Sequence, residues 1–186
     1  MASDTLSKLV TYDDYRQLPD DGKQYQIIGG ELYMTPAPTT IHQRILFKLA
    51  QAIASHAADH NLGEILIAPV DVILSMTDVV QPDIVFVAKE RMNIITQKNI
   101  VEAPDLVVEV LSGHTETIDR KKKRELYARH GVREYWIVDP EAKTIDQFLN
   151  ENGQLTRTHT IKSGETLASK IVEGLQVSVD EIFKEL

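Results

Sequence analysis

A glutamate stands in the middle of an otherwise apolar run, and this feature constrains the fold more than any other. Residues 103–112 read APDLVVEVLS, and Glu109 is the only charged side chain between Asp105 and Ser112. A short run this rich in β-branched residues predicts a strand that is buried on both faces of its sheet. An unpaired charge at such a position is strongly destabilising, so Glu109 must find partners from other parts of the chain.

The remaining periodicity predicts a mixed α/β fold, in which a mixed sheet carries a helix on each side. Helices are expected at residues 11–18, 40–60 and 116–130 and near the C-terminus at 178–186, with Thr11 and Gly131 as caps. Strands are expected on either side of Gly29-Gly30, at 64–75 with an interruption at Ala68-Pro69, at 83–88, 105–111 and 133–140, and in a hairpin about Asn152-Gly153.

Length and composition indicate one globular domain over residues 1–186. The chain has no cysteine, which excludes disulfides and thiolate metal sites. No long apolar segment or leader is apparent, so we expect a cytoplasmic protein without membrane contact. The net charge of −8 argues against a protein that coats nucleic acid non-specifically, although the segment RKKKR, residues 120–124, forms one local basic island.

A second carboxylate stands at the start of the strand that precedes the Glu109 strand. Asp83 follows Pro82 in VVQPDIVFVA, and strands that are consecutive in sequence are usually neighbours in the sheet. Two carboxylates held together repel each other unless a cation lies between them, and Mg²⁺ prefers oxygen ligands. The structural alternative is that Glu109 pairs with a lysine or arginine while Asp83 caps its strand, and the spacing alone leaves both interpretations open.

The helix that follows carries a third polar group toward the same place. Asp119, Lys123 and Tyr127 are spaced four residues apart and share one helix face, whereas Lys121 and Lys122 point elsewhere, to solvent. A lysine beside a carboxylate–metal pair would orient a water and stabilise charge on a phosphoryl group. The alternative is that the whole basic run is a solvated helix face.

Taken together, the motifs resemble a known family. Pro82-Asp83 followed by an acid in the next strand is similar to the PD-(D/E)xK nuclease signature. The ordered series YQIIGGELYMTPAP, HQRI, VQPDIVFV, APDLVVEVLS and DRKKKRELYARHGVREYWIVDP, from about residue 25 to 140, resembles the Uma2 family of endonucleases, also called DUF820.

This resemblance implies a restriction-endonuclease-like core with a central mixed sheet flanked by helices, in which Asp83 and Glu109 bind Mg²⁺, or Mn²⁺ in its place. The signature would place its lysine two residues after Glu109, where this chain has Leu111. The resemblance assigns the lysine instead to Lys123 on the following helix. It also matches Glu31, in GGELY, to a further acidic position that serves as a metal or water ligand.

The leading hypothesis is therefore metal-dependent hydrolysis of phosphodiester bonds in nucleic acid, DNA in the first instance. Asp83, Glu109 and the backbone carbonyl of Val110 would hold the metal, and Lys123 would position water. Two alternatives remain: a non-catalytic module on the same fold that binds nucleic acid or protein, and a hydrolase of small phosphorylated substrates, which a closed pocket would favour.

Two further expectations concern the surroundings of the site. His42 opens the long helix and would be able to approach the acids, although a histidine in this position more often caps a helix or lies at the surface. The open edges of the sheet favour a homodimer.

Overall fold

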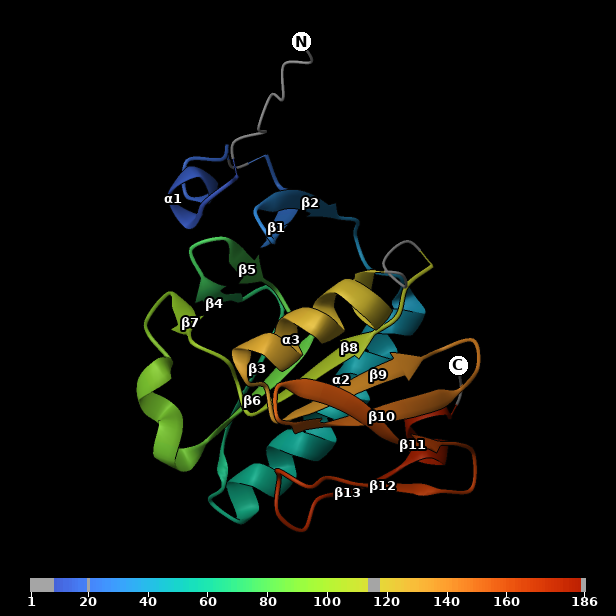
Figure 1. The fold of residues 1–186 in the computed structure, drawn as a ribbon. Coiled ribbons are helices and arrows are strands. Elements are labelled where there is room, and N and C mark those ends of the chain that lie inside the picture. Colours follow the sequence, from blue (N-terminus) through green and yellow to red (C-terminus); the bar gives the residue numbers. More distant parts are fainter. Residues whose placement is uncertain (1–8, 20, 114–117, 185–186) are drawn as a thin grey trace.

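The computed structural model describes residues 9–19, 21–113 and 118–184. Of three sheets, the two larger ones pack against each other, the third has only the two strands at 166–168 and 176–178, and a long helix covers the outer face of the largest sheet (Figure 1). The helices are α1 (Tyr12–Tyr15), α2 (Thr40–Asp59), α3 (Arg124–His130) and α4 (Val179–Phe183), with a 3₁₀ helix η1 (Lys89–Ile94) and a π-helix η2 (Ile118–Lys123).

The strands are β1 (Gln24–Ile28), β2 (Glu31–Thr35), β3 (Gly63–Ile67), β4 (Asp71–Ser75), β5 (Asp78–Val80), β6 (Ile84–Ala88), β7 (Asn99–Val101), β8 (Leu106–Val110), β9 (Glu134–Asp139), β10 (Thr144–Glu151), β11 (Gln154–Ile161), β12 (Thr166–Ala168) and β13 (Gln176–Ser178).

The larger sheet is the mixed central sheet that the sequence predicted. Its six strands lie in the order β11-β10-β9-β8-β6-β3, and the pair β8–β9 is parallel while the other pairs are antiparallel. Strand β8 is therefore interior, and all five of its residues are buried. The expectation of a strand buried on both faces is confirmed.

The two faces of β8 belong to different hydrophobic cores. Leu106, Val108 and Val110 pack with α2, whereas Val107 and Leu111 pack with α3. Alternation along a strand therefore assigns the Glu109 side chain to the α3 side. The predicted helix on each side of the sheet is confirmed, with α3 in front and α2 behind in Figure 1.

A second sheet on the α3 side was not anticipated. It has five strands in the order β2-β1-β5-β4-β7, and its apolar side chains, including Ile28, Val72 and Val80, join the core beneath α3. The predicted strand at 64–75 contributes its first half, β3, to the larger sheet and its second half, β4, to this one. The predicted interruption at Ala68-Pro69 is thus the point where the chain passes between sheets.

Local signals placed most element ends correctly. Thr11 caps α1 in a capping box with Asp14, although this helix ends at Tyr15 rather than at residue 18. The long helix begins one residue after its cap, Thr39, and the hairpin about Asn152-Gly153 joins β10 to β11. Gly131 ends α3 with φ +87°, in the left-handed region that a helix C-cap requires.

The helix predicted at 116–130 is not α-helical throughout its described part. Its described part begins at Ile118 and forms a π-helical turn, η2, before it continues as α3. Residues 116 and 117, and residues 185 and 186 of the predicted C-terminal helix, lie outside the described residues. No helix in the described ranges is both long and apolar enough to cross a membrane.

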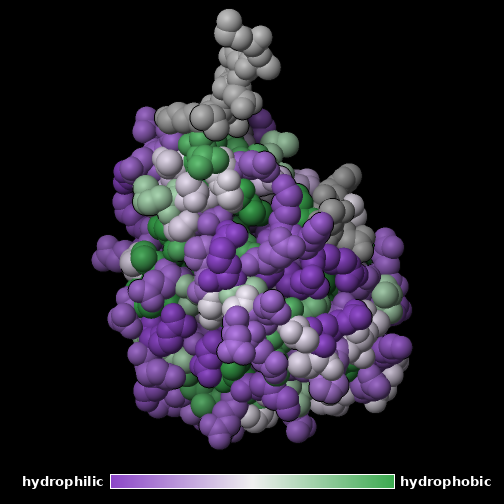
Figure 2. Space-filling view, viewed as in Figure 1, coloured by the Kyte–Doolittle hydropathy of each residue, from purple (hydrophilic) through white to green (hydrophobic). Residues whose placement is uncertain are grey.

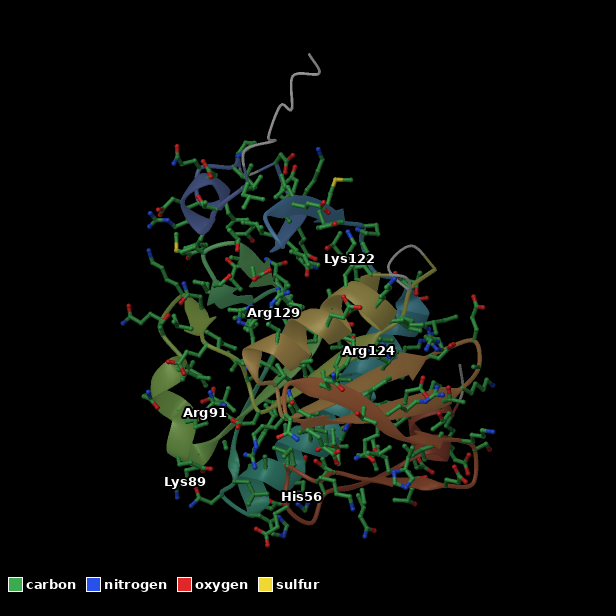
Figure 3. All side chains as sticks on the ribbon, viewed as in Figure 1. His56, Lys89, Arg91, Lys122, Arg124 and Arg129 are labelled. Atoms are coloured by element: carbon green, nitrogen blue, oxygen red, sulfur yellow. The ribbon has the colours of Figure 1, made fainter. Side chains whose placement is uncertain are left out.

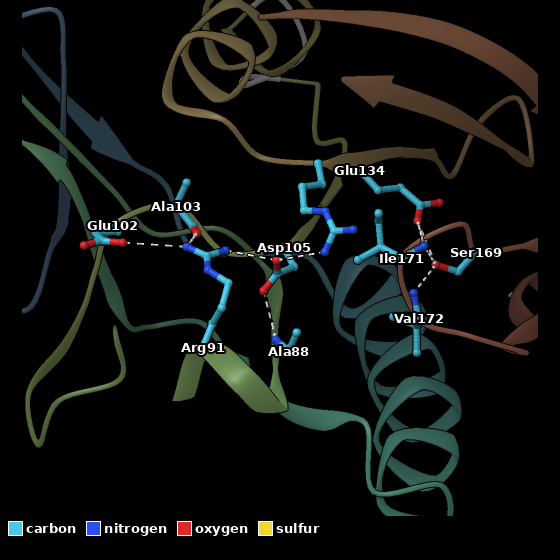
Figure 4. Close-up of polar contacts among 10 residues, drawn as sticks. Ala88, Arg91, Glu102, Ala103, Asp105, Glu134, Ser169, Ile171 and Val172 are labelled. Atoms are coloured by element: carbon cyan, nitrogen blue, oxygen red, sulfur yellow. Dashed lines mark hydrogen bonds and ion pairs between the residues drawn. The ribbon is translucent and has the colours of Figure 1, made fainter. Parts of the chain in front are cut away.

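Two completely buried carboxylates hold the far end of the larger sheet together (Figure 4). Asp105 accepts hydrogen bonds from the Ala88 backbone N–H at 2.9 Å and from Arg91 at 3.0 Å. Glu134, at the start of β9, accepts five hydrogen bonds, from Trp136 Nε1, Gln147 Nε2, Ser169 Oγ and the backbone N–H groups of Lys170 and Ile171. Glu134 thereby ties the segment after β12 to the sheet.

Replacing Glu134 with alanine should lower the free energy of unfolding by roughly 3–5 kcal/mol, because five donors lose this acceptor and two of them, on Trp136 and Gln147, are buried. Urea unfolding followed by circular dichroism measures this change, with Glu151→Ala as the control because Glu151 is exposed. Equal stability of the two variants would contradict the structural role of Glu134.

Candidate active site

A cavity of about 390 Å³ opens where the two sheets and the start of α2 meet. The larger sheet and the π-helix contribute its charged lining, Asp83, Glu109, Asp119 and Lys123. The smaller sheet and its connections contribute amide and apolar side chains, among them Gln26 and Gln81. The cavity therefore contains the residues that the sequence singled out for chemistry, with the exception of Glu31.

Asp83 and Glu109 are neighbours across the antiparallel pair β6–β8. Ile84 lies opposite Val108, and continuing this register by one residue brings Asp83 opposite Glu109. Asp83 Oδ2 accepts hydrogen bonds from the Val110 backbone N–H at 2.7 Å and from His42 Nε2 at 3.1 Å. His42, from the first turn of α2, thus does approach the acids, and it is buried.

Glu109 is paired with the helix on its own side of the sheet. Its Oε1 accepts hydrogen bonds from Lys123 Nζ at 2.8 Å and from Tyr127 Oη at 2.6 Å. The Glu109 and Lys123 side chains are only 4% and 6% exposed. The prediction that Asp119, Lys123 and Tyr127 share one helix face is therefore correct, and the face extends from η2 into α3. Such π-helical turns are frequent at functional sites.

Asp119 completes the charged cluster. Its Oδ1 forms an ion pair with Lys123 Nζ at 3.1 Å, but this oxygen accepts no hydrogen bond and is buried. Three acidic side chains, Asp83, Glu109 and Asp119, therefore act on one lysine, and when all three are ionised their negative charge exceeds the charge that Lys123 balances. An excess of this kind favours the approach of a cation.

Burial and charge shift the pKa values of these groups in opposite directions. The strongest effect on Glu109 is burial, which raises its pKa. The positive charge of Lys123 lowers this pKa, whereas the negative charges of Asp119 and Asp83 raise it further. The resulting pKa of Glu109 is about 8. Burial alone would lower the pKa of Lys123, but Asp119 and Glu109 raise it above its ordinary value. Lys123 consequently stays cationic at neutral pH.

The two other groups that contact these acids are affected in the same way. Burial acts to lower the pKa of His42, but Asp83 and Glu109 together raise it by more, so it lies above its ordinary value. Burial, followed by the charge of Glu109, raises the pKa of the Tyr127 hydroxyl well above its ordinary value. Tyr127 is therefore a neutral hydrogen-bond donor.

The buried side-chain atoms that lack a hydrogen-bond partner, as far as the described residues go, all belong to residues that line this cavity. They are Gln26 Oε1, His42 Nδ1, Gln81 Oε1 and Asp119 Oδ1. Native proteins leave few buried polar groups unpaired, and each such group calls for an explanation. The residues around the cavity thus carry polar atoms that the fold covers without satisfying.

The donor atoms suit a hard divalent cation only in part. No three histidine or acidic side chains of the described chain are arranged to hold a metal ion. Mg²⁺, however, commonly binds through one or two carboxylates, with waters and substrate phosphates as its other ligands. Asp83 Oδ1 and Glu109 Oε2 accept no hydrogen bond within the described residues, so two carboxylate oxygens remain for it. The residues present therefore fit such an ion.

Glu31 does not join this cluster. Its side chain is 66% exposed and accepts hydrogen bonds from Tyr33 Oη and, at 3.1 Å, from Lys122 Nζ. Lys122, which was expected to point to solvent, also lies over the Tyr33 ring at 4.9 Å. Tyr33 lines the cavity, so Glu31 and Lys122 connect β2 to η2 beside it. The role of Glu31 as a metal or water ligand stays a prediction.

Basic side chains outside the cavity gather along α3. Lys122 and Arg129 are labelled on the side of this helix toward the smaller sheet in Figure 3, and Arg124 on the side toward β10; the surface in this region is largely hydrophilic in Figure 2. Arg124 is also stacked over the Phe148 ring at 5.6 Å. Of the basic run 120–124, only Lys121 and Lys122 are exposed, Arg120 and Arg124 are half-buried and Lys123 is buried in the cavity, so the alternative of a fully solvated basic face is wrong.

Two cavity residues escaped the sequence analysis. Gln26 received no role and Gln81 was not considered, because glutamine carries no metal-ligand or acid–base signature. Gln81 directly precedes Pro82-Asp83, and a polar side chain between apolar Val80 and the motif was the one available signal.

A central mixed sheet with helices on both faces, bearing an Asp–Glu pair on adjacent strands and a lysine on the next helix, defines a protein of the restriction-endonuclease-like class. The sequence pattern of the Uma2 family, described as "Putative restriction endonuclease", matches residues 12–180. The chain belongs to the Uma2 family.

One solved structure supports the fold. A crystal structure of a putative nuclease belonging to DUF820 from Anabaena variabilis ATCC 29413 superposes with a TM-score of 0.76 at 19% sequence identity, covering 94% of this chain and 97% of that one. The type IIG restriction endonuclease BpuSI is matched with a TM-score of 0.42 at 15% identity, over 80% of this chain and 16% of BpuSI. A search of curated proteins finds no match.

The environment of Glu109 predicts an unusual titration. Without metal, the carboxyl carbon of Glu109 should titrate near pH 8, whereas that of Glu31, whose pKa is lowered by Tyr33 and Lys122, should titrate below the ordinary range. Because the folded-state pKa of Glu109 exceeds its unfolded value of about 4.3, its contribution to stability is present below that value and is lost as the pH rises toward 8. Carbon-13 NMR of glutamate carboxyls measures both midpoints, and a Glu109 midpoint below 4.5 would contradict this description of the site.

Proposed function

We propose that this protein is a metal-dependent endonuclease that hydrolyses phosphodiester bonds, with DNA as its substrate. The single observation that carries the proposal is the meeting of Asp83, Glu109 and Lys123, from two strands and a helix, in one cavity. Family membership supports a nuclease, while the metal and the nature of the nucleic acid belong to the proposal.

In this proposal the oxygens left free on Asp83 and Glu109 hold Mg²⁺, together with the backbone carbonyl of Val110. The ion, when bound, supplies Lewis acidity toward a phosphoryl oxygen and lowers the pKa of a water molecule. Lys123 stays cationic beside the reacting phosphate, where it orients the attacking water and balances the developing negative charge.

The neighbouring side chains keep these groups in position. His42 and the Val110 N–H both bond to Asp83 Oδ2, so the other oxygen of Asp83 is turned away from them. Tyr127 holds Glu109 Oε1 at 2.6 Å and stays protonated. Both carboxylates therefore have one constrained and one available oxygen, an arrangement that preorganises a binding site.

Support for a nucleic-acid substrate comes from the basic side chains along α3 beside the cavity. Lysine and arginine attract phosphates through a salt-dependent charge interaction, and the acidic remainder of the surface limits non-specific association. A homodimer, which would suit cleavage of both strands of a duplex, and a cytoplasmic location are further parts of the proposal.

A second candidate function is hydrolysis of a small phosphorylated substrate. The observation in its favour is the cavity, whose volume of about 390 Å³ is in the range of small-molecule sites. Cleavage of a polymer distinguishes the two, because an enzyme restricted to small phosphate esters leaves plasmid DNA intact.

The native chain should convert supercoiled plasmid to nicked or linear DNA with Mg²⁺ or Mn²⁺, and EDTA should stop the reaction. Glu109→Ala and the more conservative Glu109→Gln should abolish cleavage, because each removes a metal-binding carboxylate. Glu125→Ala is the matched control, since Glu125 is an exposed acid on α3. Persistent cleavage by a clean preparation of the Glu109 variants would refute the assignment.

Lys123 and Lys121 provide a test of the lysine, since they are two residues apart but only Lys123 is buried in the cavity. Lys123→Met should lower the single-turnover cleavage rate by about 10²–10³-fold, because a charge that stabilises the transition state is lost. Lys121→Met should leave that rate within about threefold. Thermal unfolding checks that both variants fold, and equal rates for the two folded variants would remove Lys123 from the mechanism.

A further inference from the structure

We propose that Lys122 binds a backbone phosphate of the nucleic acid at the rim of the cavity, and that Glu31 occupies Lys122 as long as no substrate is bound. The inference rests on the proposed function and adds to it a substrate-binding residue and an internal competitor for that residue. It is drawn from a polar contact between β2 of the smaller sheet and the π-helix η2, beside the cavity.

The contact consists of three side chains, Glu31, Tyr33 and Lys122. Lys122 Nζ donates to Glu31 Oε2 at 3.1 Å and also to Tyr33 Oη, and the Tyr33 hydroxyl donates to the same Glu31 oxygen. The Lys122 ammonium lies 4.9 Å from the centre of the Tyr33 ring, a distance at which the face of the ring attracts a cation. One ammonium on η2 therefore has a carboxylate and an aromatic ring of β2 as its partners.

This contact lies at the rim of the cavity and is open to solvent. Tyr33 lines the cavity, and so do Asp119 and Lys123, which stand on either side of Lys122 in the sequence of η2. The Lys122 and Glu31 side chains, however, are 50% and 66% exposed. When one phosphate of a polymer lies in the cavity, a neighbouring phosphate can therefore reach the Lys122 ammonium from solvent.

Three other basic side chains of the run 120–124 are held in different surroundings. Arg120 forms ion pairs with an aspartate of β9 and an aspartate of β10. Lys123 is buried in the cavity against Glu109, and Arg124 is stacked over an aromatic ring of β10. Lys122 differs from these three because its ion-pair partner comes from the smaller sheet and is itself exposed. Lys122 is therefore the member of this group that can exchange its partner for a phosphate at the cavity.

Glu31 takes the place of a phosphate in this contact. Both groups are anionic, and both accept hydrogen bonds from an ammonium. Hydrogen bonds from Tyr33 and Lys122 lower the pKa of Glu31, so its carboxylate is charged at neutral pH. An exposed ion pair contributes little stability, because water and salt screen it. A substrate phosphate therefore displaces Glu31 at a small cost in free energy, and Lys122 exchanges an internal anion for the substrate.

A competitor and a metal ligand respond to the loss of the Glu31 charge in opposite ways. If Glu31 were a metal ligand, Glu31→Gln would weaken Mn²⁺ binding. As a competitor, Glu31 weakens substrate binding, so the same variant should bind nucleic acid more tightly and leave Mn²⁺ binding unchanged. Glutamine suits this test because it keeps an acceptor for the Tyr33 hydroxyl and removes only the charge.

Fluorescence anisotropy of a labelled DNA duplex, at low salt and with EDTA present to prevent cleavage, measures the affinity. Glu31→Gln should bind the duplex about three- to fivefold more tightly than the native chain, and added salt should reduce this gain. Lys122→Met should weaken binding by a similar factor, because a phosphate contact is lost. Glu125→Gln is the matched control for charge, since Glu125 is an exposed acid on α3 and its replacement changes the net charge equally.

Two comparisons decide the outcome. In the Lys122→Met background, Glu31→Gln should lose its advantage over Glu125→Gln, because the competitor acts only through this lysine. An equal gain in the Glu31 and Glu125 variants, or a gain from Glu31→Gln that persists without Lys122, would overturn the inference. Weaker Mn²⁺ binding by folded Glu31→Gln, measured by electron paramagnetic resonance, would also overturn it and would return Glu31 to the metal site.

These binding measurements are separate from the test of the proposed function. The expected changes in affinity without cleavage of any nucleic acid would keep the phosphate contact and overturn the nuclease. Plasmid cleavage that requires Glu109, together with an affinity for DNA that does not respond to Glu31→Gln, would keep the nuclease and overturn the roles of Glu31 and Lys122.

Discussion

The buried contact of Glu109 with Lys123 and Tyr127 is the interaction on which the rest of this structure depends. Each partner is almost inaccessible to water, so either charge alone would be strongly destabilising in its position. The central strand can therefore carry a carboxylate only when the following helix is docked with its lysine and with Tyr127 in place. Formation of the core and formation of the charged cavity are for this reason coupled, and the π-helical turn carries both Asp119 and Lys123.

This dependence explains what could be predicted from the sequence. Glu109 and Asp83 violate the apolar pattern of their strands, and a violation in a core strand signals a partner in space. Lys123 followed from helical spacing. The smaller sheet could not be predicted in the same way, because β5 and β7 are only three residues long and their pairings join distant parts of the chain. Gln26 and Gln81 were missed because their place in the cavity lining depends on which side of that sheet meets the acids.

Two glutamates show where local sequence is insufficient. Glu31 stands in a motif that resembles a functional position, yet its carboxylate is exposed and pairs with Lys122. Glu134 lies beside Arg133 in a strand and has the appearance of an ordinary surface acid, yet it is completely buried and accepts five hydrogen bonds. Three of these donors come from residues 169–171, at least 35 positions further along the chain. Only the folded arrangement distinguishes a surface pair from a structural acid.

Residues of both larger sheets line the cavity, so the relative position of the two sheets determines its shape. Asp78, on the smaller sheet, accepts hydrogen bonds from the Gly29 N–H at 2.7 Å and from Ser75 at 2.9 Å, and its other contacts are Arg129 and His130 at the end of α3. Burial acts to raise the pKa of Asp78, but these hydrogen bonds and the charge of Arg129 lower it by more, so the group stays ionised. Its stabilising contribution is present above the unfolded-state pKa and is lost as the pH falls through the folded-state value. A charged link outside the cavity thus holds the smaller sheet against the end of α3, the helix that continues from the π-helical turn bearing Lys123.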